Sequence, residues 1–222
     1  MKQKVLMSWS SGKDSAWALY QLLQNPEFEV FGLFCTINKK FNRVAMHSVR
    51  VELLQQQAEQ IGLPLYIIEL PFPCSNADYE AIMGDFVAQA QHDQIDCFAF
   101  GDLFLEDIRQ YRVDKLKGTG IEPIFLIWGI PTQQLSRQII TGGLKAITTC
   151  IDSKQAPEHL IGKAFDDSFL DSLPETVDPC GENGEFHSFV FDAPIFKHAI
   201  NISLGDIVHR DGFVFADILP KN

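Results

Sequence analysis

The segment from Ser8 to Ser15, SWSSGKDS, combines the residue types that bind phosphate. It follows a short apolar run and opens a helical pattern, and the start of a helix presents free backbone N–H groups and a positive dipole end to an anion. Gly12 permits close backbone approach, and Lys13 adds a point charge. The candidate phosphate-binding residues are Ser8, Ser10, Ser11, Gly12, Lys13, Asp14 and Ser15.

This segment is not a Walker A loop. That motif needs a glycine five positions before Gly12, where Met7 stands, and Ser or Thr after the lysine, where Asp14 stands. An acid beside phosphates is repulsive unless it caps the helix or meets a cation, and Asp14 suits either role. The competing interpretation is a serine-rich helix cap that binds no ligand.

A second polar group follows the apolar run 96–101. Gly101 and Asp102 end a predicted strand, and strand ends of a doubly wound sheet face the same crevice as the phosphate loop. Arg109 and Arg112 are three residues apart, so both can point to one side of a helix and bind an anion. Alternatively, they pair with acids such as Glu106 on a solvated surface.

A third polar group is the turn DPCGENGEFHS at 178–188. Taken alone, it is typical of a β-turn with incidental acids. Two histidines stay open between structural and functional roles: His47, which can cap a predicted helix, and His187, which lies in a strand-like run.

The elements that position these groups alternate along the first two thirds of the chain. Predicted strands are 4–8, 30–36, 65–70, 96–101 and 123–128, and predicted helices are 15–24, 47–61, 77–92 and 103–116. The later part predicts helices at 132–141 and 162–173, and strands at 144–151, 186–191, 199–204 and 212–218. This order predicts an α/β fold with a doubly wound parallel sheet, followed by a smaller α+β C-terminal domain. We place the boundary so that residues 1–130 bind the nucleotide and residues 131–222 bind the substrate.

The loop resembles the SGGKDS pyrophosphate loop of the PP-loop, or N-type, ATP pyrophosphatases, which belong to the HUP-like adenine nucleotide alpha hydrolase superfamily. Ser11 stands where that pattern has its first glycine, which restricts the local backbone. Three further segments resemble motifs of the diphthine–ammonia ligase family: MHSVR at 46–50, GDLFLEDIR at 101–109 and GENGEFH at 181–187.

The resemblance implies an ATP-dependent amidation in which a carboxylate is adenylated and ammonia displaces AMP, after pyrophosphate has left. It implies that residues 10–15 hold the pyrophosphate, that Asp14 and Asp102 hold Mg²⁺, and that His47 and Gly101 lie near the nucleotide. The implied substrate-binding residues are Arg109, Arg112, Gly181, Glu182, Asn183, Gly184, Glu185 and His187. The implied catalytic residues are Lys13, Asp102, Glu182 and Glu185, one carboxylate of which removes a proton from ammonium. The expected carboxylate acceptor is protein-borne diphthine or a small molecule.

The amino-acid composition limits the classes of partner and the compartment that we expect for this chain. The 222 residues carry a formal net charge of −11, which argues against nucleic acid as a partner. No apolar run is long enough for a membrane helix or a secretory signal, and the five cysteines include no CxxC pair, so we expect a cytoplasmic protein with reduced thiols. An apolar run at 213–215 is a candidate homodimer contact.

Two other functions compete with amide ligation. One is a tRNA thiolase with the same loop, which needs reactive cysteines or an iron–sulfur cluster and a basic RNA-binding surface. The other is an adenine-nucleotide-binding protein that does not release pyrophosphate.

Overall fold

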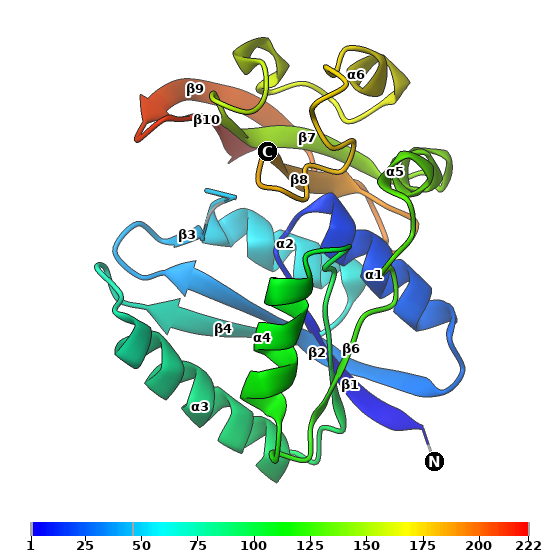
Figure 1. Ribbon diagram of the computed structural model, residues 1–222, viewed down its shortest axis with the longest axis vertical. Helices are drawn as coiled ribbons and strands as arrows, with labels where there is room; N and C mark the ends of the chain where they lie inside the picture. Colours follow the sequence, from blue (N-terminus) through cyan, green and yellow to red (C-terminus); the bar gives the residue numbers. More distant parts are fainter. Residues whose placement is uncertain (1, 46, 222) are drawn as a thin grey trace.

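Two β-sheets, joined by a helical segment, organise the chain (Figure 1). The computed structural model describes residues 2–45 and 47–221. Sheet A contains β1 (Gln3–Ser8), β2 (Phe28–Asn38), β3 (Arg43–Val44), β4 (Leu65–Leu70), β5 (Cys97–Ala99) and β6 (Glu122–Ile124). Its strands are parallel except β3, which pairs antiparallel with the end of β2. The parallel order is β4-β2-β1-β5-β6, as predicted for a doubly wound sheet.

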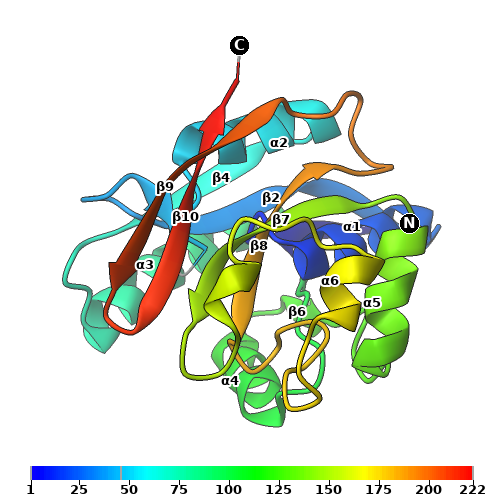
Figure 2. The same cartoon turned by 90° about the horizontal axis from the view of Figure 1, so that it is seen from above.

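Sheet B is antiparallel and has the order β8-β7-β10-β9. Its strands are β7 (Lys145–Asp152), β8 (Phe186–Asp192), β9 (Ile202–Arg210) and β10 (Phe213–Pro220). Helix α5 (Thr132–Thr141) leads into this sheet, and a 3₁₀ turn (Glu158–Leu160) and α6 (Asp167–Asp171) lie between β7 and β8. Seen from above, β9 and β10 form a long hairpin over the molecule (Figure 2).

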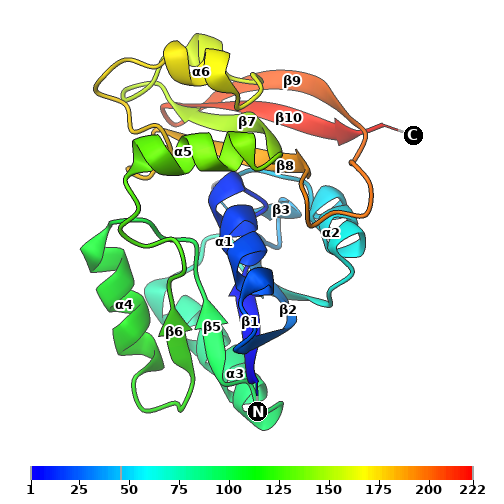
Figure 3. The ribbon, with the colours of Figure 1, turned by 90° about the vertical axis from the view of Figure 1, so that its right-hand side faces the viewer.

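Helices α1 (Lys13–Gln24) and α2 (Val51–Ile61) lie between the two sheets (Figure 3). One core cluster joins them: it contains Val5 and Met7 of β1, Leu19 of α1, Leu53 of α2 and Phe189 of β8. Sheet B therefore packs on the α1–α2 side of sheet A rather than standing apart.

Helices α3 (Asn76–His92) and α4 (Glu106–Leu116) cover the other side of sheet A (Figure 1). A second core cluster, which includes Leu6 of β1, Phe34 of β2 and Phe98 of β5, lies under them. Neighbouring residues of β1 thus enter different cores, as expected for a strand that is buried on both faces. Among the described helices, none combines the length and apolar composition that a bilayer crossing requires.

The helix predicted from residue 47 begins only at Val51, because the preceding segment is extended or left-handed. Ser48 has a φ of 56°, and Arg50 precedes the helix with a φ of −62° and a ψ of 139°. His47 therefore does not cap this helix, and the helix has no side-chain cap. Met46, the first residue of the predicted motif, lies outside the described residues.

The helix predicted at 162–173 is also wrong over most of its length. Residues 163–165 run beside β7, where the Phe165 N–H donates to the Ala146 carbonyl at 2.9 Å, and only Asp167–Asp171 are helical. Backbone pairing with β7 takes the hydrogen bonds that a longer helix would use. The strand predicted at 199–204 is β9, which extends to Arg210 through residues that are largely exposed.

Candidate functional site

The phosphate-loop residues lie where the order of sheet A reverses. β1 pairs with β2 on one side and with β5 on the other. The strands that follow β1 are therefore added first on its β2 side and then, from β5 onward, on its opposite side. The carboxyl ends of these strands carry the 8–15 segment and Gly101-Asp102. A Cβ on Gly101 would stand 2.9 Å from the Ser15 nitrogen, so the two segments are in contact. Crevices at such reversals are where α/β sheets bind ligands.

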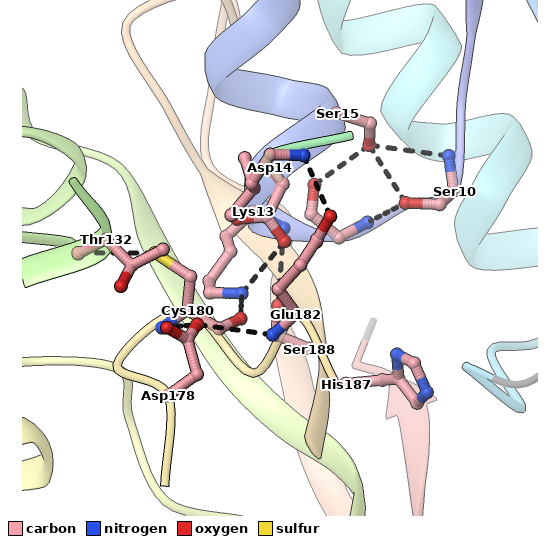
Figure 4. Close-up of polar contacts among 12 residues, drawn as sticks. Ser10, Lys13, Asp14, Ser15, Thr132, Asp178, Cys180, Glu182, His187 and Ser188 are labelled. Carbon is pink, nitrogen blue, oxygen red and sulfur yellow. Dashed lines mark hydrogen bonds and ion pairs between the residues drawn. The ribbon is translucent and has the colours of Figure 1, made fainter. Parts of the chain in front are cut away.

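The loop folds around its own hydroxyl groups (Figure 4). Ser10 Oγ and Ser15 Oγ are 3.0 Å apart, the Gly12 N–H donates to Ser10 Oγ at 3.3 Å, and Ser15 Oγ donates to the Gly12 carbonyl at 3.0 Å. Gly12 precedes α1 without any side-chain cap. The Lys13 N–H donates to Ser188 Oγ at 3.2 Å, and no side-chain cap is seen for the rest of the first turn of α1, which suits a phosphate.

Ser11 occupies a conformation that favours glycine. Its φ is 69°, its side chain is fully buried, and its Oγ has no hydrogen-bond partner among the described residues. This explains physically why the similar loops carry glycine at this position.

Replacing Ser11 by Gly should stabilise the protein relative to Ser11→Ala. Both changes remove the unpartnered hydroxyl, but only glycine also relieves the left-handed backbone, a difference of about 1 kcal/mol. Urea denaturation of the two variants measures this difference in the free energy of unfolding. An alanine variant as stable as the glycine variant would contradict the strain at this position.

Gln57 is a site residue that sequence patterns do not indicate. It is fully buried on α2, accepts a hydrogen bond from the Trp9 indole at 2.9 Å, and donates to the carbonyls of Ser11 at 3.1 Å and Val190 at 2.6 Å. One side chain thus ties the strained loop to both α2 and β8. Its place in the helical pattern predicts only that it faces the core. Its hydrogen bonds depend on the loop, α2 and β8 lying together in the folded chain.

Lys13 points beneath the loop rather than freely into the crevice (Figure 4). It is only 2% exposed, and its Nζ lies 2.9 Å from Asp14 Oδ2 and donates to the Cys180 carbonyl. It also lies over the rings of Phe165 and Phe186, at 5.4 and 5.1 Å from their centroids. This lysine therefore links the N-terminal half of the chain to the C-terminal half.

The ion pair between Lys13 and Asp14 leaves one oxygen of the Asp14 carboxylate without a partner among the described residues. Burial lowers the pKa of Lys13, but its acidic neighbours, Asp14 first and then Cys180 and Glu182, together outweigh burial, so the pKa is raised. Burial raises the pKa of Asp14 despite the neighbouring ammonium. Asp14 Oδ1 is buried without a hydrogen-bond partner in the described part of the chain, and no side-chain capping by Asp14 is seen. The site can therefore accept a further positive charge.

Asp102 and the two predicted arginines separate in the structure. Arg112 binds Asp102 through two nitrogens, at 2.5 and 3.0 Å, and stacks over Phe100 at 4.3 Å. Arg109 instead lies over Trp128 at 4.7 Å and has Glu106 at 3.9 Å. Arg109 thus follows the alternative interpretation, in which it lies near an acid of its own helix. Arg112 instead pairs with Asp102, which follows β5.

The 178–188 turn reaches the crevice through one of its two glutamates. Glu182 accepts a hydrogen bond from the Leu103 N–H at 2.8 Å, and burial raises the pKa of its carboxyl to about 7. Glu185 faces into the turn, where it accepts from the Asp178 N–H at 3.0 Å and the Asn183 amide at 2.9 Å. The Glu185 carboxylate is therefore a structural group of the turn, contrary to its predicted contact with substrate.

Glycines make this turn possible. Gly181 and Gly184 have φ values of 70° and 85°, and a Cβ on Gly181 would stand 2.8 Å from the Phe186 carbonyl. Both conditions exclude larger side chains at Gly181. The glycines predicted to contact substrate thus shape the turn that presents Glu182.

The two histidines meet although 140 residues separate them in the sequence. Their ring centroids are 4.7 Å apart, His47 Nδ1 lies 3.0 Å from the Ser188 carbonyl, and His187 Nε2 is buried with no partner in the described chain. Burial lowers the pKa of His47 to about 4 and that of His187 to about 3, so both rings are neutral at pH 7. A Cβ on Gly12 would stand 2.6 Å from His47 Cε1, which places this pair against the loop.

A cavity of about 940 Å³ connects these groups. The predicted site residues that line it are Ser8, Ser10, Lys13, Asp14, Ser15, His47, Gly101, Asp102, Arg112, Gly181, Glu182 and His187. Those that do not line it are Ser11, Gly12, Arg109, Asn183, Gly184 and Glu185. The lining combines the candidate phosphate-binding residues with the Glu182 carboxyl, whose pKa burial raises to about 7.

Asp14 is the group that best fits a magnesium ion. Among the described residues, no three His, Cys, Asp or Glu side chains gather as a metal-binding cluster. Mg²⁺ bound with a nucleotide needs only one or two protein carboxylates, because phosphate oxygens and water complete its shell. The unpartnered Asp14 Oδ1 meets this requirement, whereas both oxygens of Asp102 are held by Arg112.

Comparisons with known proteins identify the family of this chain. Residues 1–120 match the family model of the diphthamide synthase N-terminal domain, and residues 131–218 match that of the C-terminal domain. Relatives named diphthine–ammonia ligase include a human protein that is 23% identical to this chain. The match covers 72% of this chain and 66% of the human protein. The zebrafish relative is 28% identical over 72% of this chain and 69% of its own length. The Schizosaccharomyces pombe relative is 25% identical over 95% of this chain but only 38% of its own length.

The chain thus spans about two thirds or less of the human and fission-yeast proteins that it matches. The two family models follow one another in the same order as sheet A and sheet B. Since the matches cover both halves of the chain, this chain belongs to the diphthamide synthase family.

Proposed function

We propose that this chain is an ATP-dependent C–N ligase that adenylates a carboxylate and transfers ammonia to it, releasing AMP and pyrophosphate. The observation that carries the proposal is one cavity lined by the phosphate loop, Asp102 and Glu182. The relatives' printed name, diphthine–ammonia ligase, supports diphthine and ammonia as candidate substrates here. The acceptor is thus a protein-borne diphthine or a small carboxylate.

In the first step, a carboxylate oxygen of the acceptor attacks the α-phosphorus of ATP, and pyrophosphate leaves with the electron pair of the broken P–O bond. The residue 10–15 loop holds the departing pyrophosphate with backbone N–H groups and serine hydroxyls. Asp14 would hold Mg²⁺, which supplies positive charge to the phosphates. The protein contributes mainly position and charge neutralisation.

In the second step, ammonia attacks the acyl carbon, and AMP leaves with the electron pair of the broken C–O bond. Ammonia in neutral solution is mostly ammonium, which must lose a proton before it can attack. Glu182 faces the cavity, and its carboxyl has a pKa of about 7, so it can accept this proton at neutral pH. Glu182 is the proposed base, and Glu185 supports the turn that carries it.

A tRNA thiolase is the second candidate, and the four buried thiols weigh against it, whereas the Cys74 thiol is exposed. Burial raises the pKa of Cys35 to about 12, of Cys97 to about 11 and of Cys150 to about 12. The Cys180 thiol is also buried, with a raised pKa. Such thiols are poor sources of the thiolate that sulfur transfer requires. A nucleotide-binding protein without turnover is the third candidate.

Product analysis separates these candidates. The full chain is incubated with ATP, Mg²⁺, ammonium and candidate carboxylates, and nucleotides are resolved by chromatography. AMP and pyrophosphate formed in proportion to amide support the ligase. ADP and phosphate would refute adenylation, sulfur incorporation into tRNA from a persulfide donor would support the thiolase, and bound but intact ATP would support the binding protein.

A further inference from the structure

Strand β9 forms one edge of sheet B. It is the last strand in the order β8-β7-β10-β9, and in the described part of the chain it pairs only with β10. Figure 2 shows β9 on the outer side of the β9–β10 hairpin. The apolar run 213–215, which the sequence offers as a dimer contact, lies in β10 and pairs with both β7 and β9. A strand that extends sheet B on this side must therefore pair with β9.

Residues 206–210 of this edge are exposed on both faces of the sheet. Ile207 and Val208 point to opposite faces, yet their side chains are 47% and 51% exposed. Natural edge strands are commonly protected from pairing by lysine or proline, and this segment, DIVHR, has neither. An exposed apolar edge of this kind is a template for another strand.

The turn at the end of the hairpin determines which backbone groups of β9 are free. Both residues of the turn 211–212 have a positive φ, 53° and 86°, which is typical of a two-residue hairpin turn. The residues that close such a turn are hydrogen-bonded to each other, and the pairs beyond them alternate. The N–H and C=O groups of Arg210 and Val208 therefore face β10. Those of Ile207 and His209 face outward.

The charged side chains of this edge have few partners within the chain. Among the described residues, no lysine or arginine lies within ion-pair distance of Asp206, and Arg210 has one such acid, Asp211 at 3.9 Å. Because side chains alternate along a strand, Asp206 and Arg210 share the face that carries Val208. Arg210 lies over Phe215 on this face, at 4.9 Å from the ring centroid. A negative and a positive group thus flank Val208.

We propose that two copies of this chain dimerise through β9, paired antiparallel about a two-fold axis at Val208. In this register, Ile207 of each copy exchanges two backbone hydrogen bonds with His209 of the other. Val208 of one copy lies opposite Val208 of the other, in the closely spaced, non-hydrogen-bonded kind of pair. Asp206 of each copy lies opposite Arg210 of the other, on both sides of the Val208 pair. The two sheets B thus join into one continuous antiparallel sheet.

Charge complementarity selects this register over its neighbours. Outward-facing residues bond only to outward-facing residues, so the neighbouring registers have their axis at Ile207 or at His209. The first places Asp206 opposite Val208, and the second places Arg210 opposite Val208. Only an axis at Val208 brings the opposite charges together, which stabilises a cross-strand pair. A two-fold dimer requires this kind of self-complementarity, which favours a second copy over an unrelated strand.

Charge reversal tests both the partner and the register. Sedimentation equilibrium over a concentration series should show that the unsubstituted chain dimerises. Asp206→Arg and Arg210→Asp should each weaken the dimer about tenfold or more, because each places like charges opposite each other twice. An equimolar mixture of the two variants should restore the dimer, since both arginines of one copy then face aspartates of the other.

Asp85→Arg is the matched control, because it makes the same change of charge at an exposed position of α3 and should leave the dimer unchanged. Circular dichroism confirms that each variant folds. An unsubstituted chain that stays monomeric at every concentration would overturn the proposal, and so would a dimer that both reversals leave intact. Reversed variants that stay monomeric when mixed would overturn the pairing of β9 with itself.

This experiment is independent of the proposed ligase reaction. Residues 206–210 do not line the cavity, so the monomeric variants should bind ATP as tightly as the unsubstituted chain does. Sedimentation requires no turnover. Failure of the amidation assay would therefore leave the dimer measured, and a monomeric chain would leave the ligase reaction untouched.

Discussion

Replacing Glu182 by Gln should lower ammonia-dependent turnover about a hundredfold or more, which is the usual loss when a general base is removed. The glutamine Oε1 can still accept the Leu103 N–H, now 2.8 Å from Glu182 Oε1, so the turn keeps its anchor. Binding of ATP should change little, because Glu182 is assigned to the ammonia step. Steady-state kinetics with ATP and ammonium varied separately measure both effects.

The pH dependence of turnover tests the same assignment of Glu182. The carboxylate is the active form of the proposed base, and burial raises the pKa of Glu182 to about 7. Activity should therefore rise with pH through about 7, and Glu182→Gln should lose this limb and keep only the rise that the growing fraction of free ammonia causes at higher pH. A limb that persists in the glutamine variant would assign the titration to another group.

Glu185→Gln is the matched control, because it makes the same chemical change three residues away in the same turn. Glu185 Oε1 accepts two hydrogen bonds inside the turn, and the residue does not line the cavity. Glutamine Oε1 can still accept both hydrogen bonds, so this variant should fold and keep the rising limb. If Glu185→Gln instead removes the limb while Glu182→Gln keeps it, the two roles are reversed.

Replacing Lys13 by Met should lower the free energy of unfolding by about 3–5 kcal/mol, the cost of breaking a buried ion pair by removing one partner. Methionine fills a similar volume but leaves the Asp14 carboxylate and the Cys180 carbonyl without their shared donor. The change also removes the ammonium that lies over the Phe165 and Phe186 rings. Urea denaturation followed by circular dichroism measures the loss.

Lys163→Met, at an exposed position of the C-terminal half, controls for the loss of one positive charge and should stay within about 0.5 kcal/mol of the unsubstituted chain. A Lys13→Met variant of unchanged stability that binds ATP more weakly would contradict the structural role. It would mean that the ammonium turns toward the phosphates in solution. The experiment therefore distinguishes a buried link between the halves from a phosphate ligand.

Local residue patterns predict much of the fold. The alternation of short apolar runs and amphipathic segments predicted the parallel sheet, and two predicted ranges, 65–70 and 132–141, coincide with β4 and α5. The phosphate loop was predicted because its residue types and its place between a strand and a helix are local properties. The errors arose where a long-range contact overrode a local preference, as at 163–165, which pair with β7 instead of extending a helix.

Residue types and their order along the chain specify the chemical groups of this protein: a loop of hydroxyl, glycine and ammonium groups, a strand-end aspartate, and an acidic turn. How these groups are used depends on the folded arrangement. Glu182 and Glu185 are indistinguishable by type and neighbourhood, yet one faces the cavity and the other binds its own turn. Lys13 belongs to a phosphate-binding pattern but is buried by the C-terminal half, and Gln57 gains its role only where α2, the loop and β8 meet. The physical reason is that hydrogen bonding and burial depend on neighbours brought together from distant parts of the chain, which local residue patterns do not specify.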